Sequence, residues 1–99
     1  MNIKLINRET EGELILEGRL DSNTSPEAGK VFENVAGRFE KVTLNMEKLE
    51  YVSSAGLRII KMLYVTMNKK GGSMEITKVA PGVMEVFEMT GFAGFLKIK

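Results

Sequence analysis

The sequence contains no cysteine, no histidine and no tryptophan, and Asp21 is its one aspartate. Without cysteine, the chain has no disulfide framework, no thiolate nucleophile and no thiolate metal ligand. Without histidine, it has no imidazole to act as a general base beside a serine or to bind zinc. We therefore predict a protein that is not an enzyme and has no catalytic residue, metal or cofactor. The lack of disulfides suits a reducing cytoplasm, where we expect the protein to work.

Long apolar runs and an excess charge of one sign are also lacking. Fourteen basic residues balance thirteen acidic ones to a net charge of +1, which gives no electrostatic support for binding nucleic acid or an anionic membrane. No apolar run approaches the roughly 18 residues of a membrane span. The first residues are too poor in apolar side chains for a secretion signal. We predict no nucleic-acid partner and no membrane insertion.

The chain has 99 residues, of which 43% are hydrophobic, and this is enough for one core. No internal repeat or low-complexity segment divides it. We therefore predict a single domain over residues 1–99, and a monomer.

Hydrophobic periodicity predicts eight elements. Strands are expected at 2–8, 13–20, 42–46 and 73–77, helices at 25–39 and 55–69, a short helix from Pro81 to near Gly91, and a last strand holding Phe95, Leu96 and Ile98. We expect a loop over 47–52. The order β-β-α-β-α-β-α-β predicts an α/β fold in which an opening hairpin continues into strand–helix–strand crossovers. The sheet should be mixed, with helices mainly on one face.

A dense turn signal, DSNTSP, separates the hairpin from the first helix. Thr24 followed three residues later by Glu27 is typical of a capping box. Pro26 suits the first helical turn, where its missing N–H costs nothing. The sequence therefore predicts a capped helix start here.

Two adjacent hydroxyls, Ser53 and Ser54, stand between the strand at 42–46 and the helix at 55–69. A helix start leaves several N–H groups without partners, and serine is among the best residues to cap them. The same N–H groups and the helix dipole favour an anion such as a phosphate. The junction is therefore either a plain cap, with Ser53 capping and Ser54 in the first turn, or a serine placed for phosphorylation.

Residues 44–57, LNMEKLEYVSSAGL, resemble the signature of STAS domains, specifically that of bacterial anti-sigma factor antagonists. The run of that family is a strand ending in L-D-L, a short loop, an aromatic and an aliphatic residue, and then D-S-[ST]-G-L. S-S-A-G-L-R is a variant of it. Leu20-Asp21 with Thr24 resembles the second landmark of the family. Since the element order also agrees over the whole chain, the resemblance implies a STAS-like fold for residues 1–99.

The resemblance also implies a function. In that family an anti-sigma factor, itself a serine kinase, phosphorylates the first hydroxyl of the D-S-[ST]-G run, which by position is Ser54 here, with Ser53 as the alternative acceptor. The unphosphorylated antagonist binds the anti-sigma factor and frees the sigma factor. The phosphorylated form releases its partner, and a serine phosphatase restores it. The implied partner-binding residues are Asp21, Asn23, Thr24, Ser53, Ser54, Gly56 and Arg58.

Three positions depart from the usual pattern and keep other interpretations open. Ser53 replaces the Asp before the phosphosite, Asn45 a frequent Asp at the strand end, and Arg58 a frequent Gly. Arg58 is a candidate partner for the phosphate. The alternative function is a STAS adaptor or scaffold subunit of a signalling or transport assembly, without reversible phosphorylation. Nucleotide binding at the helix start is a further alternative. A response-regulator receiver is rejected, because Asn45 stands where an acceptor aspartate would be needed.

Overall fold

The computed structural model describes residues 1–99, and its element order confirms the predicted α/β class. The elements are β1 (Asn2–Arg8), β2 (Glu11–Leu20), α1 (Ser25–Arg38), β3 (Lys41–Val52), α2 (Ser54–Lys69), β4 (Ser73–Thr77), α3 (Pro81–Met89) and a short 3₁₀ turn, η1 (Phe92–Gly94). No helix among them is both long enough and apolar enough to cross a membrane.

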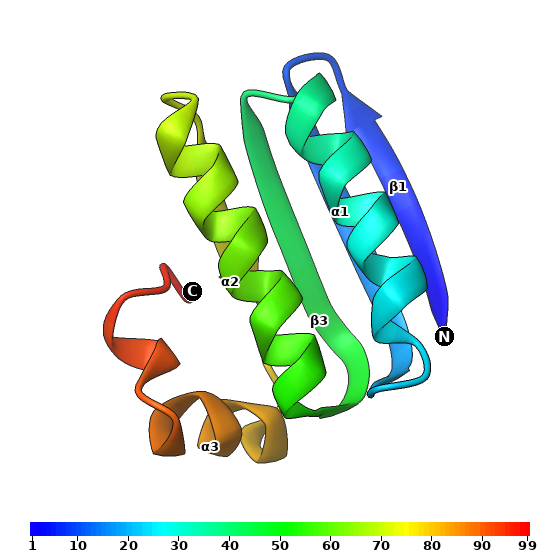
Figure 1. The fold of residues 1–99 in the computed structure, drawn as a ribbon, viewed down its shortest axis with the longest axis vertical. Coiled ribbons are helices and arrows are strands. Elements are labelled where there is room, and N and C mark those ends of the chain that lie inside the picture. Colours follow the sequence, from blue (N-terminus) through cyan, green and yellow to red (C-terminus); the bar gives the residue numbers. More distant parts are fainter.

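The four strands form one mixed sheet in the order β1-β2-β3-β4. β1 and β2 are an antiparallel hairpin, whereas β2, β3 and β4 run parallel to one another. Parallel neighbours cannot be joined by a tight turn, and α1 and α2 supply the two crossovers. The carboxyl ends of β2 and β3 therefore meet at one edge of the sheet, which is also where both helices begin (Figure 1).

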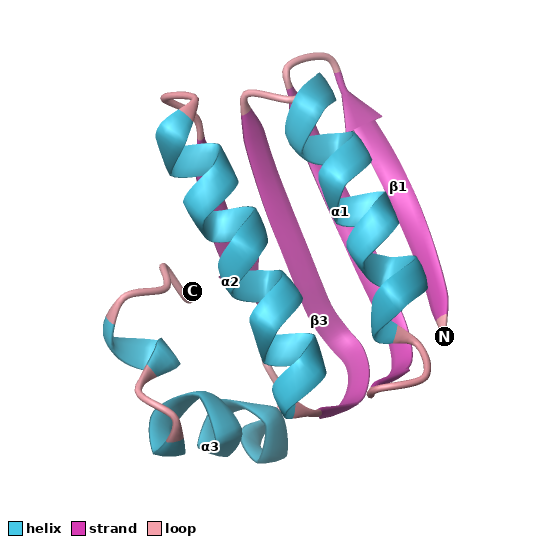
Figure 2. Ribbon diagram, in the orientation of Figure 1, coloured by secondary structure: helices cyan, strands magenta, loops and turns pink.

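Helices α1 and α2 lie side by side over one face of the sheet, and α3 crosses its end near the start of α2 (Figures 1 and 2). This confirms the prediction that the helices lie mainly on one face. The core fills the space between the two layers. It includes the fully or almost fully buried Leu14, Leu16, Phe32, Val42, Leu44, Ile60 and Met67.

The predicted loop over 47–52 is wrong, because β3 continues through it to Val52. Two irregularities in the β2–β3 register explain the error, since at each of them β3 holds one residue more than β2. The inward-facing residues Met46, Leu49 and Val52 are consequently spaced by three instead of two. Such a spacing hides the alternation by which a strand is recognised.

The predicted last strand is also wrong in its extent. Residues 92–94 form η1, and only a single parallel bridge, Ile76 to Ile98, extends the sheet beyond β4. The N–H of Ile76 donates to the carbonyl of Lys97, and the N–H of Lys99 donates to the carbonyl of Ile76, both at 2.8 Å. Phe95 leaves the sheet and packs against Tyr64 and Phe92, with ring centroids 5.4 and 5.1 Å away.

Candidate functional site

The Ser53-Ser54 junction lies at the edge where β2 and β3 end. The N–H of Ser53 donates to the carbonyl of Leu20 at 2.9 Å, which ties the end of β3 to the end of β2. The β2–α1 loop and the β3–α2 junction are thereby held next to each other. The two segments singled out in the sequence, 20–24 and 53–58, therefore lie side by side at this edge.

The two hydroxyls of the junction do different things. Ser53 has extended backbone geometry and is the N-cap of α2, where its Oγ accepts from the N–H of Gly56 at 3.3 Å. Ser54 is the first residue of the helix; its side chain is exposed, and its Oγ forms no hydrogen bond within the chain. The cap therefore does not use Ser54, whose hydroxyl is free to react or to bind.

Backbone donors beside Ser54 are also free. The N–H groups of Ser54 and Ala55 have no acceptor in the protein, as is usual for the first turn of a helix. Together with the positive end of the dipole of α2, they form a seat for an anion. An anion held at this end of α2 could accept hydrogen bonds from these two donors.

Gly56 is buried, and its position is set by packing. A Cβ atom there would lie 2.9 Å from the carbonyl oxygen of Leu20 and 2.8 Å from its Cγ. Only glycine lets the first turn of α2 approach the end of β2 this closely. Among the predicted partner-binding residues, Gly56 therefore acts by allowing this close packing. Because it is buried, it exposes little surface to a partner.

The β2–α1 loop is organised by Asp21. Its Oδ1 accepts from the N–H groups of Asn23 at 2.9 Å and Thr24 at 3.1 Å. The Oγ of Ser25 donates to the Asp21 carbonyl at 2.6 Å. The N–H of Thr24 is the largest of the influences that hold the pKa of the Asp21 carboxyl below its usual value. The carboxylate of Asp21 is thus used within the loop, whereas Asn23 is exposed.

The predicted capping box at Thr24 and Glu27 is wrong. Thr24 occupies the N-cap position of α1, but its side chain makes no cap hydrogen bond. Its Oγ1 instead accepts from the N–H of Asp21 at 2.9 Å and donates to the carbonyl of Arg19 at 2.8 Å. The Thr24 hydroxyl therefore ties the loop to β2 instead of capping α1. Pro26 lies in the first turn of α1, as predicted.

Arg58 is exposed one helical turn after Ser54, and no carboxylate pairs with it. Residues four apart lie on the same side of a helix. Arg58 is therefore on the side of α2 that carries Ser54, where the sequence analysis placed a candidate partner for a phosphate.

One pair at this edge was missed by the sequence analysis. Arg19 and Tyr51 are register partners at the ends of β2 and β3, and the guanidinium of Arg19 lies 4.2 Å from the centroid of the Tyr51 ring. Both side chains are exposed. The sequence does not predict this pair, because the two extra residues in β3 change which residues of β2 and β3 lie opposite each other. The one available signal was the aromatic residue just before the two serines.

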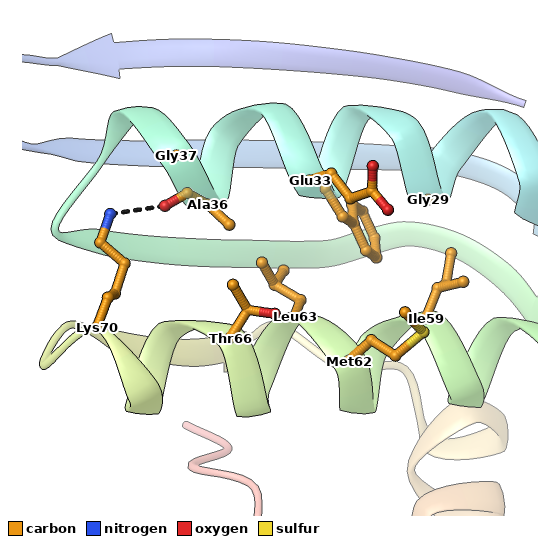
Figure 3. Close-up of a pocket in the computed structure, with 10 residues that line it drawn as sticks. Gly29, Glu33, Ala36, Gly37, Ile59, Met62, Leu63, Thr66 and Lys70 are labelled. Carbon is orange, nitrogen blue, oxygen red and sulfur yellow. Dashed lines mark hydrogen bonds between the residues drawn. The ribbon is translucent and has the colours of Figure 1, made fainter.

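A groove of about 470 Å³ lies elsewhere, between α1 and α2. Gly29 of α1 lies opposite Ile59 of α2, whereas Gly37 lies at the other end of the groove, toward Lys70 (Figure 3). At one end, the Nζ of Lys70 donates to the carbonyl oxygens of Ala36 and Phe39 at 2.6 and 2.9 Å. The groove is lined by side chains of the two long helices and does not include the Ser53-Ser54 junction.

Comparison with known proteins identifies the family to which this chain belongs. The profile described as the STAS domain matches residues 4–99. This chain belongs to the STAS domain family. The chain is also similar to an anti-sigma F factor antagonist from Paenibacillus polymyxa, with 30% identity over 102 residues that cover 99% of this chain and 87% of the relative. The STAS match thus extends over nearly every element described above.

Two solved structures share the fold of this STAS domain. The anti-sigma factor antagonist SpoIIAA in its unphosphorylated form superposes with a TM-score of 0.84 at 16% identity, over 99% of this chain and 88% of that one. The Bacillus cell fate determinant SpoIIAA in the phosphorylated form gives a TM-score of 0.77, also at 16% identity, over 99% and 91% of the two chains. At this level of identity the similarity establishes the STAS fold.

Proposed function

We propose that this STAS domain is an anti-sigma factor antagonist that works as a phospho-switch. Unmodified, it sequesters an anti-sigma factor with serine kinase activity; phosphorylated on Ser54, it releases that partner, and a serine phosphatase resets it. One observation above all supports the proposal: Ser53 caps α2, whereas Ser54 is exposed and its hydroxyl forms no hydrogen bond within the chain. The similarity to the anti-sigma F factor antagonist of Paenibacillus polymyxa supports it.

The charge of a phosphoryl group accounts for the release. Phosphorylation adds about −1.5 to −2 charge and three strong acceptor oxygens to an exposed side chain. The free N–H groups of Ser54 and Ala55 can hold these oxygens, so the domain stays folded. A partner surface packed over Ser54 would instead have to bury the new charge. An uncompensated buried charge costs about 3 kcal/mol or more, which is roughly a hundredfold in affinity.

The proposal is tested with Ser54→Ala and Ser54→Asp variants used as bait in lysate of the native cells. We expect the alanine variant to retain an anti-sigma factor, identified by mass spectrometry, and the aspartate variant to lose it. Circular dichroism of both variants should match the wild type, since Ser54 makes no structural hydrogen bond. The purified partner, given ATP, should then phosphorylate the wild type and the Ser53→Ala variant, but not Ser54→Ala.

Two results would contradict the switch. Equal retention of the partner by both variants would show that charge at Ser54 does not control binding. Absence of phosphate at Ser54 in growing and stressed cells alike would favour the adaptor function instead. The replacement of the usual Asp by Ser53 gives that alternative its specific support, because the acid that precedes the phosphosite is absent.

A further inference from the structure

The stacked pair of Arg19 and Tyr51, which we call the Arg19–Tyr51 stack, lies at the same edge as Ser54. Tyr51 is two residues before the cap Ser53, and the next register pair after the stack is Leu20 with Val52, immediately before the junction. Tyr51 is 39% exposed. A large aromatic side chain of this kind, held in place yet open to solvent, has no role in the core.

The backbone is arranged specifically to form the stack. Gly18 has a φ of +108°, and the register shifts between Gly18 and Arg19 because β3 holds an extra residue, Glu50. Because of the extra residue, Val52 is buried and Tyr51 is exposed opposite Arg19, which the regular alternation of β2 already leaves exposed. Irregularities of this kind commonly re-aim a side chain beside a functional site. The Oγ1 of Thr24 donates to the Arg19 carbonyl at 2.8 Å and holds the strand end in this position.

The donors of Arg19 are not used within the chain. No carboxylate forms a salt bridge with its guanidinium, and no acceptor receives a hydrogen bond from it. The guanidinium lies over the ring of Tyr51, 4.2 Å from its centroid. Such a pair offers a flat apolar surface beside a positive charge that forms no salt bridge, although this charge is, after the N–H of Thr24, among the influences that lower the pKa of the Asp21 carboxyl.

We infer that the Arg19–Tyr51 stack is the anchor on which the anti-sigma factor docks. It fits a partner segment in which an apolar side chain packs on Tyr51 and a neighbouring carboxylate pairs with Arg19. Tyrosine and arginine dominate interface hot spots, and side chains ordered before binding lose little entropy on association. This inference rests on the proposed function and adds to it: the stack supplies affinity, and the charge state of Ser54 decides release.

The test measures, by isothermal titration calorimetry, the Kd of the anti-sigma factor recovered with the Ser54→Ala bait. Tyr51→Ala and Arg19→Ala should each weaken binding at least about tenfold, as hot-spot truncations do. Tyr51→Phe keeps the ring and should bind like the wild type, whereas Arg19→Glu should bind more weakly than Arg19→Ala. Arg38→Ala is the matched control, because it removes the other cation–π pair, Arg38 over Phe39, at the opposite end of α1.

The results separate this inference from the proposed function. If Ser54→Asp releases the partner but Tyr51→Ala and Arg19→Ala bind like the wild type, the anchor is wrong and the switch stands. If the stack variants and Arg38→Ala weaken binding equally, the effect is not local and the anchor is again wrong. If the wild type binds no anti-sigma factor, both proposals fail. Thermal melts of every variant establish that a lost affinity is not a lost fold.

Discussion

Two neighbouring residues of the same type, Ser53 and Ser54, have separate roles because the chain changes from strand to helix between them. Ser53 still has extended geometry, so its Oγ can turn back to accept from the N–H of Gly56. Ser54 already has helical geometry, and its side chain leaves the helix toward solvent. The structural and the proposed regulatory roles can therefore be tested independently.

Replacing the two serines one at a time should affect stability very differently. Ser53→Ala removes the N-cap hydrogen bond and should lower the free energy of unfolding by about 1 kcal/mol. Ser54→Ala removes no hydrogen bond and should change it by less than about 0.5 kcal/mol, as exposed substitutions usually do. Urea denaturation of both variants checks this. If Ser54→Ala lowers the free energy of unfolding more than Ser53→Ala does, then Ser54, and not Ser53, caps α2.

The residues of the site were easier to predict than their bonding partners. Composition and spacing identified the turn at Asp21 and Thr24, since their short polar side chains compete for nearby backbone groups. Which backbone group each side-chain oxygen bonds depends on the position of the neighbouring strands. Thr24 reaches the carbonyl of Arg19, on β2, instead of the start of its own helix. A local pattern such as a capping box does not contain that information.

At the level of elements, β3 shows where pattern reading stops. Its first half alternates cleanly and was predicted, whereas its second half has inward residues three apart and was predicted to be a loop. The cause is the pairing with β2, where each extra residue in β3 must be accommodated. The same pairing forms the Arg19–Tyr51 stack. The missed strand and the missed surface pair therefore have one origin.

Two glycines in the long helices should respond in opposite ways to alanine. Gly29 lies inside α1, where an added Cβ would be 3.4 Å from the Cγ2 of Ile59, a tight but yielding contact with a side chain. Gly29→Ala should therefore stabilise the protein by about 0.5–1 kcal/mol. Gly56→Ala should destabilise it by about 1–3 kcal/mol, because its Cβ would meet the backbone of Leu20.

Thermal and urea unfolding of both glycine variants would check these signs. Gly37→Ala is the control for helix propensity alone, since nothing lies within 4 Å of a Cβ at that position. It should stabilise the protein, and by less than Gly29→Ala because Gly37 is next to the last residue of α1. A gain in stability for Gly56→Ala would mean that α2 can move away from β2 to make room for the added Cβ.

At the level of the whole molecule, the order of elements was predictable because each crossover has a long, strongly periodic helix. The end of the chain was not, because the three apolar residues Phe95, Leu96 and Ile98 do not by themselves form a strand. Phe95 packs against Tyr64 of α2 and is not part of the sheet. Only the residues next to Ile98 keep the pairing with β4. The conformation of this segment therefore depends on contacts with α2 and β4, which are far away in sequence.

The face of the sheet opposite the helices is held by ion pairs, and these should make stability depend on pH. The Nζ of Lys99 lies 3.0 Å from Oε2 of Glu75, and the Nζ of Lys41 lies 3.4 Å from its Oε1. Lys99 first, and then Lys41, lower the pKa of Glu75 below its ordinary value of 4.5, although burial of the carboxyl acts to raise it. A lowered pKa means that the folded state favours the charged carboxylate.

The sign of the pH effect follows from that preference. The stabilisation by Glu75 is fully present above pH 4.5 and is lost as the pH falls through the lower pKa of the folded state. Glu75→Gln should therefore lower the melting temperature at pH 7 and flatten its decrease below pH 4.5. Glu85→Gln is the control, because Glu85 is exposed on α3 and forms no salt bridge. Its melting curve against pH should run parallel to that of the wild type. If the Glu75→Gln curve also runs parallel, the ion pairs that join β3, β4 and the end of the chain contribute nothing to the acid stability of the sheet.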